Sequence, residues 1–130
     1  MAERRTVSTG SPWEPLVGYS RVVRIGNRVE VAGTTAMREG KVVGEGDAYA
    51  QTFEALTIIK ESLEQLGANV TDVVRTRMYV TDISRWEEIG RAHGEFFRDV
   101  KPVATMVEVK ALIDPALLVE IEAEAVVGEE

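Results

Sequence analysis

The stretch that decides the fold of this chain is Leu117-Leu118-Val119-Glu120-Ile121-Glu122-Ala123-Glu124-Ala125-Val126. From Val119 onward, apolar residues alternate with glutamates. A period of two with apolar residues on one side predicts a β-strand that buries one face. The three glutamates, called the glutamate row below (Glu120, Glu122 and Glu124), would share the other face. They need water, cationic partners or a ligand, because an unmatched carboxylate is costly to bury.

Length and composition are typical of one folded domain over residues 1–130, with 45% apolar residues. The absence of cysteine excludes disulfides, thiol catalysis and cysteine metal sites. The net charge of −7 opposes binding to a phosphate backbone, so nucleic acid is an unlikely partner. The polar N-terminal stretch shows neither a secretory signal nor a membrane span, so we expect a cytoplasmic protein.

The rest of the chain predicts alternating strands and helices. Residues 1–17 are expected to be a loosely structured lead-in, because Gly10, Pro12 and Pro15 resist regular structure. Gly26-Asn27 and Glu39-Gly40 are typical of hairpin turns. The expected elements are strands 19–25 and 28–33, a small hairpin 37–43, helix 48–66 capped by Asp47, strand 73–81, helix 85–98, strand 103–112 and the final strand.

The predicted order places both long helices on one side of the sheet. A crossover through helix 85–98 makes strands 73–81 and 103–112 parallel neighbours. The second sheet face is then left without helices, and we call it the bare face. Ser84 and Glu87 have capping-box spacing at the start of that helix. Gly90 and Gly94 inside it suggest that another element packs closely there. Local reasoning alone would pair the last two strands as a hairpin across Asp114-Pro115.

Seven short motifs give the chain a resemblance to a known family. They are Gly18-Tyr19-Ser20, Ile25-Gly26-Asn27, Ala32-Gly33-Thr34, Tyr79-Val80-Thr81-Asp82, Gly94-Glu95-Phe96-Phe97, Met106-Val107-Glu108-Val109 and Val119-Glu120-Ile121-Glu122-Ala123. In order and spacing the chain resembles the RidA/YjgF family over roughly residues 17–127. The resemblance implies a chorismate-mutase-like α+β fold with a mixed sheet and two helices on one face. It also implies a homotrimeric barrel with small-molecule clefts between subunits, and a final strand inside the sheet beside strand 73–81.

The family's best-known activity, hydrolysis of imines and enamines without a cofactor, implies a set of site residues. The catalytic glutamate matches Glu120, and the cleft tyrosine and glycine match Tyr19 and Gly33. The arginine that clamps the substrate carboxylate, two residues after a proline, falls on Ala104. A methyl group cannot hold a carboxylate. The chain therefore matches the family better in the residues of its fold than in the residue that binds the substrate carboxylate.

Each site residue has a structural alternative. Glu120 either handles water or a proton, or pairs with Arg75 or Arg77 at a subunit interface. Arg77 either replaces the missing clamp or only pairs with the glutamate row.

Other residues also leave alternatives open. Tyr19 either lines a cleft or packs at an interface. Thr105 is expected to point toward the helices, and His93 to pack on the apolar side of its helix.

No metal-ligand pattern or phosphate loop is present in the sequence. Three functions therefore remain open. The chain is a small-molecule imine or enamine hydrolase, a ligand-binding or regulatory trimer without turnover, or an endoribonuclease and translation inhibitor. The last is the least favoured, because no basic groove or aromatic platform is evident.

Overall fold

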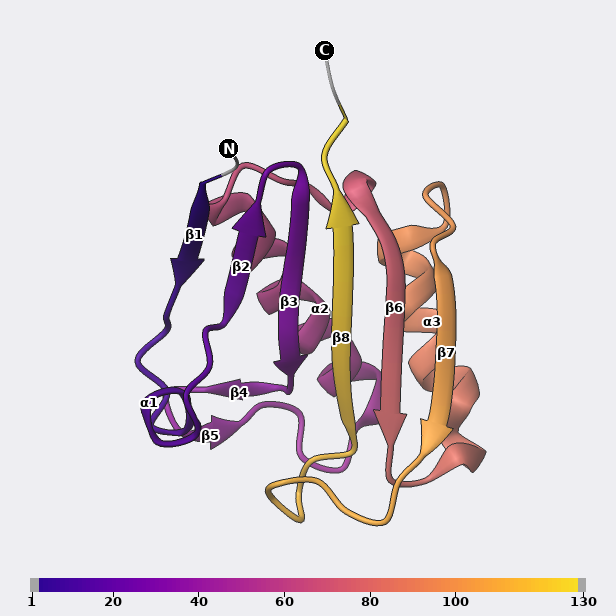
Figure 1. Ribbon diagram of the computed structural model, residues 1–130. Coiled ribbons are helices and arrows are strands. Elements are labelled where there is room, and N and C mark those ends of the chain that lie inside the picture. Colours follow the sequence, from indigo (N-terminus) through magenta and orange to yellow (C-terminus); the bar gives the residue numbers. More distant parts are fainter. Residues whose placement is uncertain (1–2, 129–130) are drawn as a thin grey trace.

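The computed structural model describes residues 3–128 of the chain. A six-stranded sheet in the order β1-β2-β3-β8-β6-β7 forms one layer, with a separate β4-β5 hairpin at one end (Figure 1). In chain order the elements are β1 Arg4–Val7, α1 Trp13–Val17, β2 Val22–Ile25, β3 Arg28–Thr34, β4 Met37–Arg38, β5 Lys41–Val42, α2 Ala48–Gln65, the 3-10 helix η1 Val70–Asp72, β6 Val73–Val80, the 3-10 helix η2 Ile83–Arg85, α3 Trp86–Phe97, β7 Val103–Glu108 and β8 Val119–Val126. The fold is α+β with a mixed sheet, as predicted.

The final strand lies inside the sheet. β8 runs antiparallel to β3 on one side and to β6 on the other. Its apolar residues Val119, Ile121 and Ala123 are at most 1% exposed, whereas the glutamates between them are only partly buried. This confirms the position that the family resemblance implied and contradicts the hairpin that local reasoning favoured. β6 and β7 are parallel, as expected for strands joined through α3.

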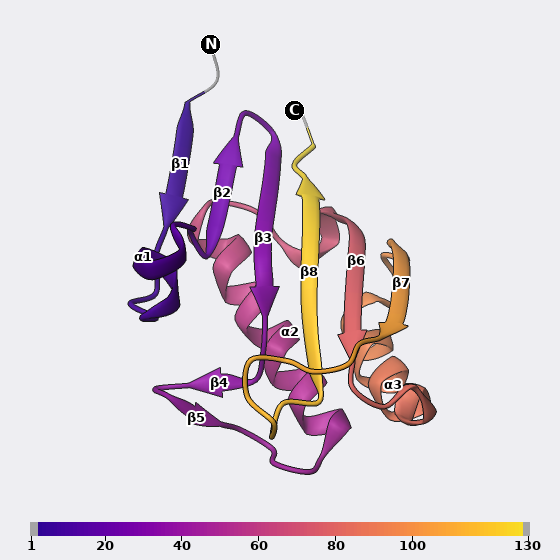
Figure 2. The ribbon, with the colours of Figure 1, turned by 60° about the horizontal axis from the view of Figure 1, so that its bottom comes forward.

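Helices α2 and α3 cover one face of the sheet (Figures 1 and 2). The backbone N–H of Ala50 donates to the Asp47 side chain at 2.9 Å, which confirms the predicted N-cap. The core lies between helices and sheet and includes Leu56, Ile59, Ile89 and Ile121. Within residues 3–128 neither long helix covers the opposite face of the sheet, so the predicted bare face exists in the subunit.

The N-terminal lead-in is more ordered than the sequence suggested. Arg4–Val7 pairs antiparallel with Val22–Ile25 as an edge strand, and α1 follows. The residues on which the prediction relied do not interrupt these elements: Gly10 lies between them, Pro12 is the N-cap of α1 and Pro15 lies inside this short helix. Gly18 ends α1 with φ of 92° and donates its N–H to the Glu14 carbonyl.

Three predictions about the second helix and the strand after it were wrong. Ser84 does not cap α3; its N–H and hydroxyl both donate to Asp82, which caps η2 instead. Among the described residues, no other element reaches within 4 Å of where a Cβ of Gly90 or Gly94 would stand; only the Arg98 side chain, just past the end of α3, lies 3.6 Å from the Gly94 position. Strand β7 also ends at Glu108, earlier than expected.

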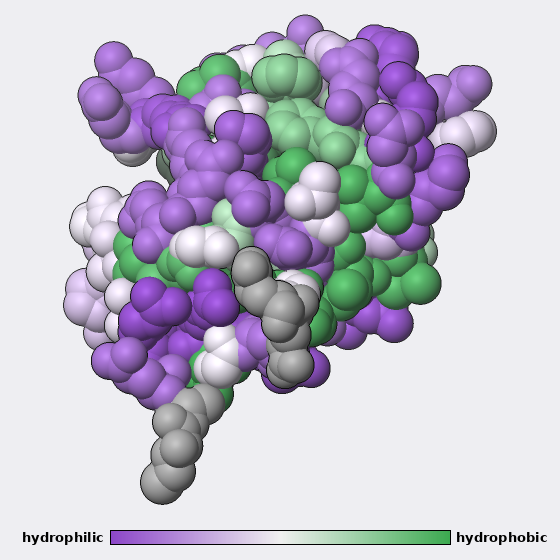
Figure 3. All heavy atoms as spheres, turned by 90° about the horizontal axis from the view of Figure 1, so that it is seen from above, coloured by the Kyte–Doolittle hydropathy of each residue, from purple (hydrophilic) through white to green (hydrophobic). Residues whose placement is uncertain are grey.

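The bare face is partly apolar. Its exposed large hydrophobic residues are Ile25, Val103, Val107 and Val126. Seen from above, hydrophobic patches lie between hydrophilic residues at the end of the molecule (Figure 3). A surface of this mixed kind suits contact with another protein surface.

Candidate functional site

A β-bulge in β3 lies beside the glutamate row. Val31 pairs with Ala123 and Thr34 pairs with Ile121, so Ala32 and Gly33 together lie opposite the single residue Glu122. Such bulges bend a strand and are common next to active sites. A Cβ added to Gly33 would stand 2.2 Å from Glu120 Oε2. Only glycine therefore leaves room for the Glu120 carboxylate where it lies.

Glu120 has the environment expected of a proton-transfer group. Burial raises the pKa of its carboxyl, the negative charge of Glu122 raises it further, and the Arg21 guanidinium partly opposes both. Within residues 3–128, no hydrogen bond contributes to this pKa. Glu120 pairs in register with Tyr79, whose hydroxyl donates to Glu122 instead, at 3.0 Å. The Glu120 carboxylate therefore keeps its acceptor positions open.

Arg21 and Glu14 form a buried ion pair next to this carboxylate. Arg21 is 8% exposed and Glu14 is 2% exposed, and Arg21 Nε lies 3.8 Å from Glu14 Oε2. Arg21 NH1 donates to the Gly33 carbonyl at 3.0 Å and to the Thr34 hydroxyl at 2.8 Å. The guanidinium carbon also lies 5.9 Å from the centroid of the Tyr19 ring. Tyr19, Gly33 and Glu120 are thus gathered around one guanidinium.

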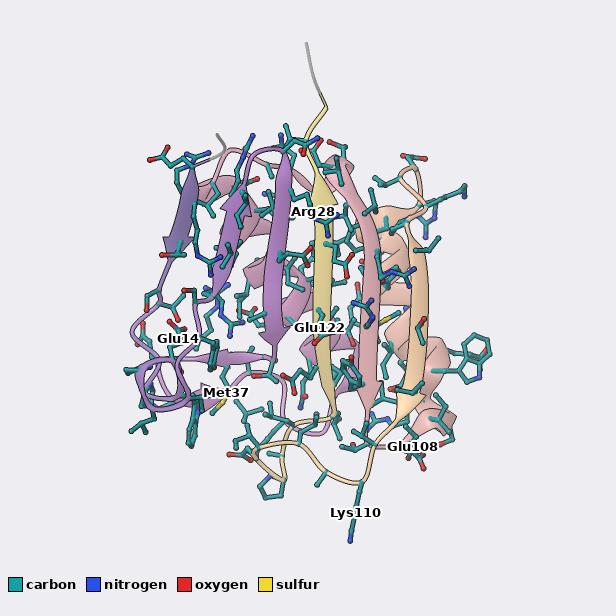
Figure 4. All side chains as sticks on the ribbon, viewed as in Figure 1. Glu14, Arg28, Met37, Glu108, Lys110 and Glu122 are labelled. Atoms are coloured by element: carbon teal, nitrogen blue, oxygen red, sulfur yellow. The ribbon has the colours of Figure 1, made fainter. Side chains whose placement is uncertain are left out.

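The other two glutamates of the row are paired across the strand. Arg77 NH1 lies 2.8 Å from Glu124 Oε2 and 3.8 Å from Glu122 Oε1. Figure 4 shows Glu122 near the middle of the sheet and Glu14 beside α1. The hydrogen bond to Glu124 raises the pKa of Arg77, and this effect outweighs desolvation, which lowers it. Arg75 pairs in register with Glu124, but no ion pair of Arg75 is found among the described residues.

An open groove of about 710 Å³ runs beside Tyr19. The segment around α1 forms one wall, through Ser11 and Glu14, and the bare-face side of β2 and β3 forms the other, through Val23 and Glu30. Ala32 also lines it, so the groove reaches the bulge that holds Gly33. The single subunit therefore offers a shallow surface that a second subunit could close.

Ala104 lies apart from these residues. It pairs with Thr76 in the parallel register, and Thr76 is buried on the helix side, so Ala104 faces that side of the exposed edge strand β7. Thr105 pairs with Arg77 and lies on the bare face, which contradicts the expected direction toward the helices. The strand starts at Val103 as predicted, but which of its residues face the helices is set by its pairing with β6, which the sequence does not reveal. Within one subunit, Ala104 and Glu120 do not share a site.

The described part of the chain offers no other obvious chemistry. No group of three or more His, Cys, Asp or Glu side chains in residues 3–128 is arranged to hold a metal ion. None of the described helices is long and apolar enough to cross a membrane. His93 Nε2 lies 2.9 Å from the Thr76 hydroxyl, and burial lowers the pKa of His93. His93 therefore packs under the sheet, as expected.

Comparison with known proteins places this arrangement in a family. Residues 9–127 match the family model described as endoribonuclease L-PSP. The crystal structure of Rv2704 from Mycobacterium tuberculosis, a member of the YjgF/YER057c/UK114 family, is 56% identical with a TM-score of 0.87, covering 96% of this chain and all of that one. The chain belongs to the RidA/YjgF family. Structures of this family are typically trimers.

Two curated proteins are also similar to this chain, and one of them is named for an activity. An uncharacterised protein of Streptomyces coelicolor is 42% identical over 95% of this chain and 92% of its own length. A protein named 3-aminoacrylate deaminase RutC, from Acinetobacter baylyi, is 33% identical over 86% of this chain and 88% of its own length.

Sequence reasoning missed two residues that the structure brings to the site. Glu14 lies in the N-terminal segment that was expected to be loose, and Arg21 precedes a strand without any motif of its own. A sequence signal did exist, because Glu14 and Arg21 are opposite charges flanking the motif Gly18-Tyr19-Ser20. Only the fold shows that this pair is buried against the bulge.

Proposed function

We propose that this protein forms a homotrimer in the cytoplasm and hydrolyses small imines or enamines to a carbonyl compound and ammonia, in clefts between subunits. The observation that carries the proposal is the Glu120 carboxylate. It lies against Gly33, it is partly buried with a raised pKa, and its acceptor positions are open. The trimers typical of the family and the relative named 3-aminoacrylate deaminase support it. No cofactor takes part in the proposed chemistry.

The raised pKa of Glu120 suits both proton transfers that the reaction requires. In its acid form Glu120 donates a proton to the enamine carbon, which gives the iminium. As a carboxylate it then accepts a proton from water while the water oxygen attacks the iminium carbon. Glu120 passes this proton to the nitrogen of the resulting carbinolamine. The C–N bond then breaks and ammonia leaves, while the hydroxyl proton returns to the Glu120 carboxylate as the C=O bond forms. A carboxyl group whose pKa is shifted toward neutrality populates both forms more evenly near pH 7.

The residue that would bind the substrate's carboxylate departs from the family pattern. Ala104 offers no cation for a carboxylate, and Arg77 is occupied by Glu122 and Glu124. Arg77 is thus better explained as the partner of the glutamate row than as a replacement clamp. Ala104 therefore favours an uncharged or bulkier substrate over a small anionic one. The same methyl group favours the second candidate function, a trimer that binds a small ligand without turnover.

An endoribonuclease activity has weaker support. The net charge is −7, and the bare face carries the three glutamates of the row near its centre. A negatively charged surface repels a phosphate backbone. Incubation of the purified protein with labelled RNA should leave the RNA intact.

The decisive test measures ammonia release from enamines and imines that a second enzyme generates in the assay mixture. Two substrates should be compared, namely 2-aminoacrylate and an uncharged imine of similar size. Glu120→Gln should lower kcat/KM by about 10²- to 10⁴-fold, the usual contribution of a general acid–base group. Glu64→Gln is the matched control, because Glu64 pairs with Lys60 on α2 and lies away from the bare face. Equal turnover by wild type and Glu120→Gln would contradict the proposal.

An Ala104→Arg variant separates the two candidate functions. If the wild type is inert and Ala104→Arg is active on 2-aminoacrylate, the scaffold is competent and lacks only the clamp. Mass determination in solution tests the assembly at the same time. A monomer at micromolar concentration would remove the inter-subunit cleft on which the proposal depends.

A further inference from the structure

A chain of buried polar contacts connects the N-terminal segment to the bulge in β3. Glu14 accepts hydrogen bonds from the Ser8 hydroxyl at 2.5 Å, the Thr9 hydroxyl at 2.6 Å and the Thr9 N–H at 3.1 Å. Burial tends to raise the pKa of Glu14, but these hydrogen bonds and the charge of Arg21 outweigh it, so the pKa is lowered. Glu14 is therefore a buried anion facing Arg21.

Arg21 connects this anion to the backbone of the bulge. One guanidinium nitrogen, NH1, donates to both the Gly33 carbonyl and the Thr34 hydroxyl. The Thr34 hydroxyl in turn donates to the Ala32 carbonyl at 2.7 Å. All three residues from Ala32 to Thr34 are thus tied to one nitrogen atom. A guanidinium suits this task because its donors are held in a rigid plane.

The position of the bulge sets the position of Glu120. The Cα of Gly33 lies so close to the Glu120 carboxylate that even a methyl group would collide with it. The charged and titratable groups that face Glu120 are Glu122 from the same strand and Arg21 from the segment before β2. Tyr79 lies opposite on β6 and has its hydroxyl directed to Glu122. Of these groups, only Arg21 is a cation.

A direct role for Arg21 as a substrate anchor fits the geometry poorly. Its side chain is 9% exposed, NH1 is engaged by the bulge, and Nε faces Glu14. A ligand carboxylate held by two guanidinium nitrogens would have to displace one of these partners. Arg21 instead holds other groups in place.

We propose that Arg21, held by Glu14, is a positioning residue that fixes the Ala32–Thr34 backbone and thereby places the Glu120 carboxylate for proton transfer. The catalytic part of this inference rests on the proposed hydrolysis. The positional part does not, because it can be measured on Glu120 without any substrate. The N-terminal segment that carries Glu14 thus belongs to the site although it need not touch the substrate.

The experiment is a pH titration of Glu120 by carboxyl-carbon NMR in protein labelled at glutamate, with Glu120→Gln used to assign the resonance. Arg21→Met removes the neighbouring cation and should raise the pKa of Glu120 by roughly one unit, the low end of the effect of a close opposite charge. Glu14→Gln leaves Arg21 less neutralised and should shift the same pKa downward. Shifts of opposite sign show that the charges of this pair act on Glu120, and the charge-conserving Arg21→Lys variant then separates position from charge.

Arg24→Met is the matched control. Arg24 also donates to backbone carbonyls, those of Gly26 and Leu66, but it is not among the charges that shift Glu120. Its loss should leave the pKa of Glu120 unchanged. If Arg21→Met shifts that pKa no more than Arg24→Met does, the inference is overturned.

Arg21→Lys provides a second route should Arg21→Met fail to fold. The lysine keeps the positive charge, so the pKa of Glu120 should move less than in Glu14→Gln. It loses the planar guanidinium that holds the bulge, so kcat should fall while KM stays near its wild-type value. An unchanged kcat in folded Arg21→Lys, with turnover still dependent on Glu120, would also overturn the inference. Opposite pKa shifts in a protein without turnover would support the placement of Arg21 and Glu14 beside Glu120 and refute the hydrolysis.

Discussion

Two arginines approach the glutamate row, and their surroundings differ. Arg77 is 40% exposed and pairs with Glu122 and Glu124 on the neighbouring strand. Arg21 is almost fully buried and is neutralised by Glu14, which lies outside the row. As a result Glu122 and Glu124 are paired with Arg77. Glu120 has only Arg21 as a nearby cation, and Arg21 is already paired with Glu14. Three glutamates in one alternating pattern therefore have different chemistry.

The largest expected effect comes from Gly33→Ala. The added Cβ would collide with Glu120 Oε2, which is the far end of a flexible side chain, so the carboxylate moves away rather than the backbone. We expect kcat/KM to fall by roughly 10²-fold, the usual result of misplacing a catalytic group by about 1 Å. The free energy of unfolding should change by less than about 1 kcal/mol. Steady-state kinetics and chemical denaturation measure the two effects.

Gly90→Ala is the control for that substitution. Gly90 lies in α3, and the described residues leave the space at its Cβ position open, so alanine should stabilise the helix by up to about 1 kcal/mol. Activity should be retained. If Gly33→Ala lowers stability strongly and leaves activity intact, Glu120 is not the group that Gly33 accommodates.

A smaller effect should appear in the pH dependence of stability. The pKa of Glu14 is lowered in the folded protein, so its contribution is present above the ordinary carboxyl pKa of about 4.3 and is lost as the pH falls through the lowered value. The pKa of Glu120 is raised, so stability declines as the pH rises from the ordinary value through the raised one. Denaturation across pH 2–8, roughly spanning both titrations, should show these opposite slopes.

Two glutamine variants assign those slopes. Glu14→Gln should flatten the acid side of the stability curve, and Glu120→Gln should flatten the side that approaches neutrality. The comparison between the two carboxylates would fail if both variants altered the same side.

The smallest effect on Glu120 should come from Arg77→Met. Arg77 is not among the charges that shift the pKa of Glu120, so the NMR titration of this carboxyl should move less than in Arg21→Met. The substitution leaves Glu122 and Glu124 without their cation on the bare face, so dissociation of the proposed trimer should occur at higher protein concentration. Sedimentation over a concentration series measures this second effect. An Arg77→Met shift as large as that of Arg21→Met would remove the distinction between the two arginines.

Much of the fold could be predicted because the decisive signals are local. The alternation from Val119 onward, the Asp47 cap and the Gly26-Asn27 turn each act over a few residues, and the structure contains all three. The order of the strands is a long-range property, and local reasoning misplaced the final strand; the family resemblance supplied the correct neighbour. The first strand was missed because the prediction extended the effect of Gly10, Pro12 and Pro15 to residues 4–7, which precede them and pair with β2.

The site was predictable only where a motif marks it. Glu120, Gly33 and Tyr19 were named from their motifs, and the structure gathers them around one guanidinium. Arg21 and Glu14 escaped notice because an arginine and a glutamate in a polar stretch look like surface residues, and burial is set by tertiary packing. Ala104 stands where the family clamp is expected, yet it lies on the other side of the sheet from Glu120 in the same subunit.

The bulge in β3 also decides which way the end of that strand faces. Without the bulge, Thr34 would follow Glu30 and Ala32 onto the outer surface, because side chains alternate along a strand. The extra residue turns Thr34 inward to 2% exposure, where its hydroxyl meets Arg21. Deleting Gly33 should therefore restore regular pairing, with Ala32 opposite Glu122 and Thr34 still facing inward opposite Ile121. The deletion would remove only the carbonyl that accepts from Arg21, so the local shape of the strand would change while the rest of the sheet kept its register.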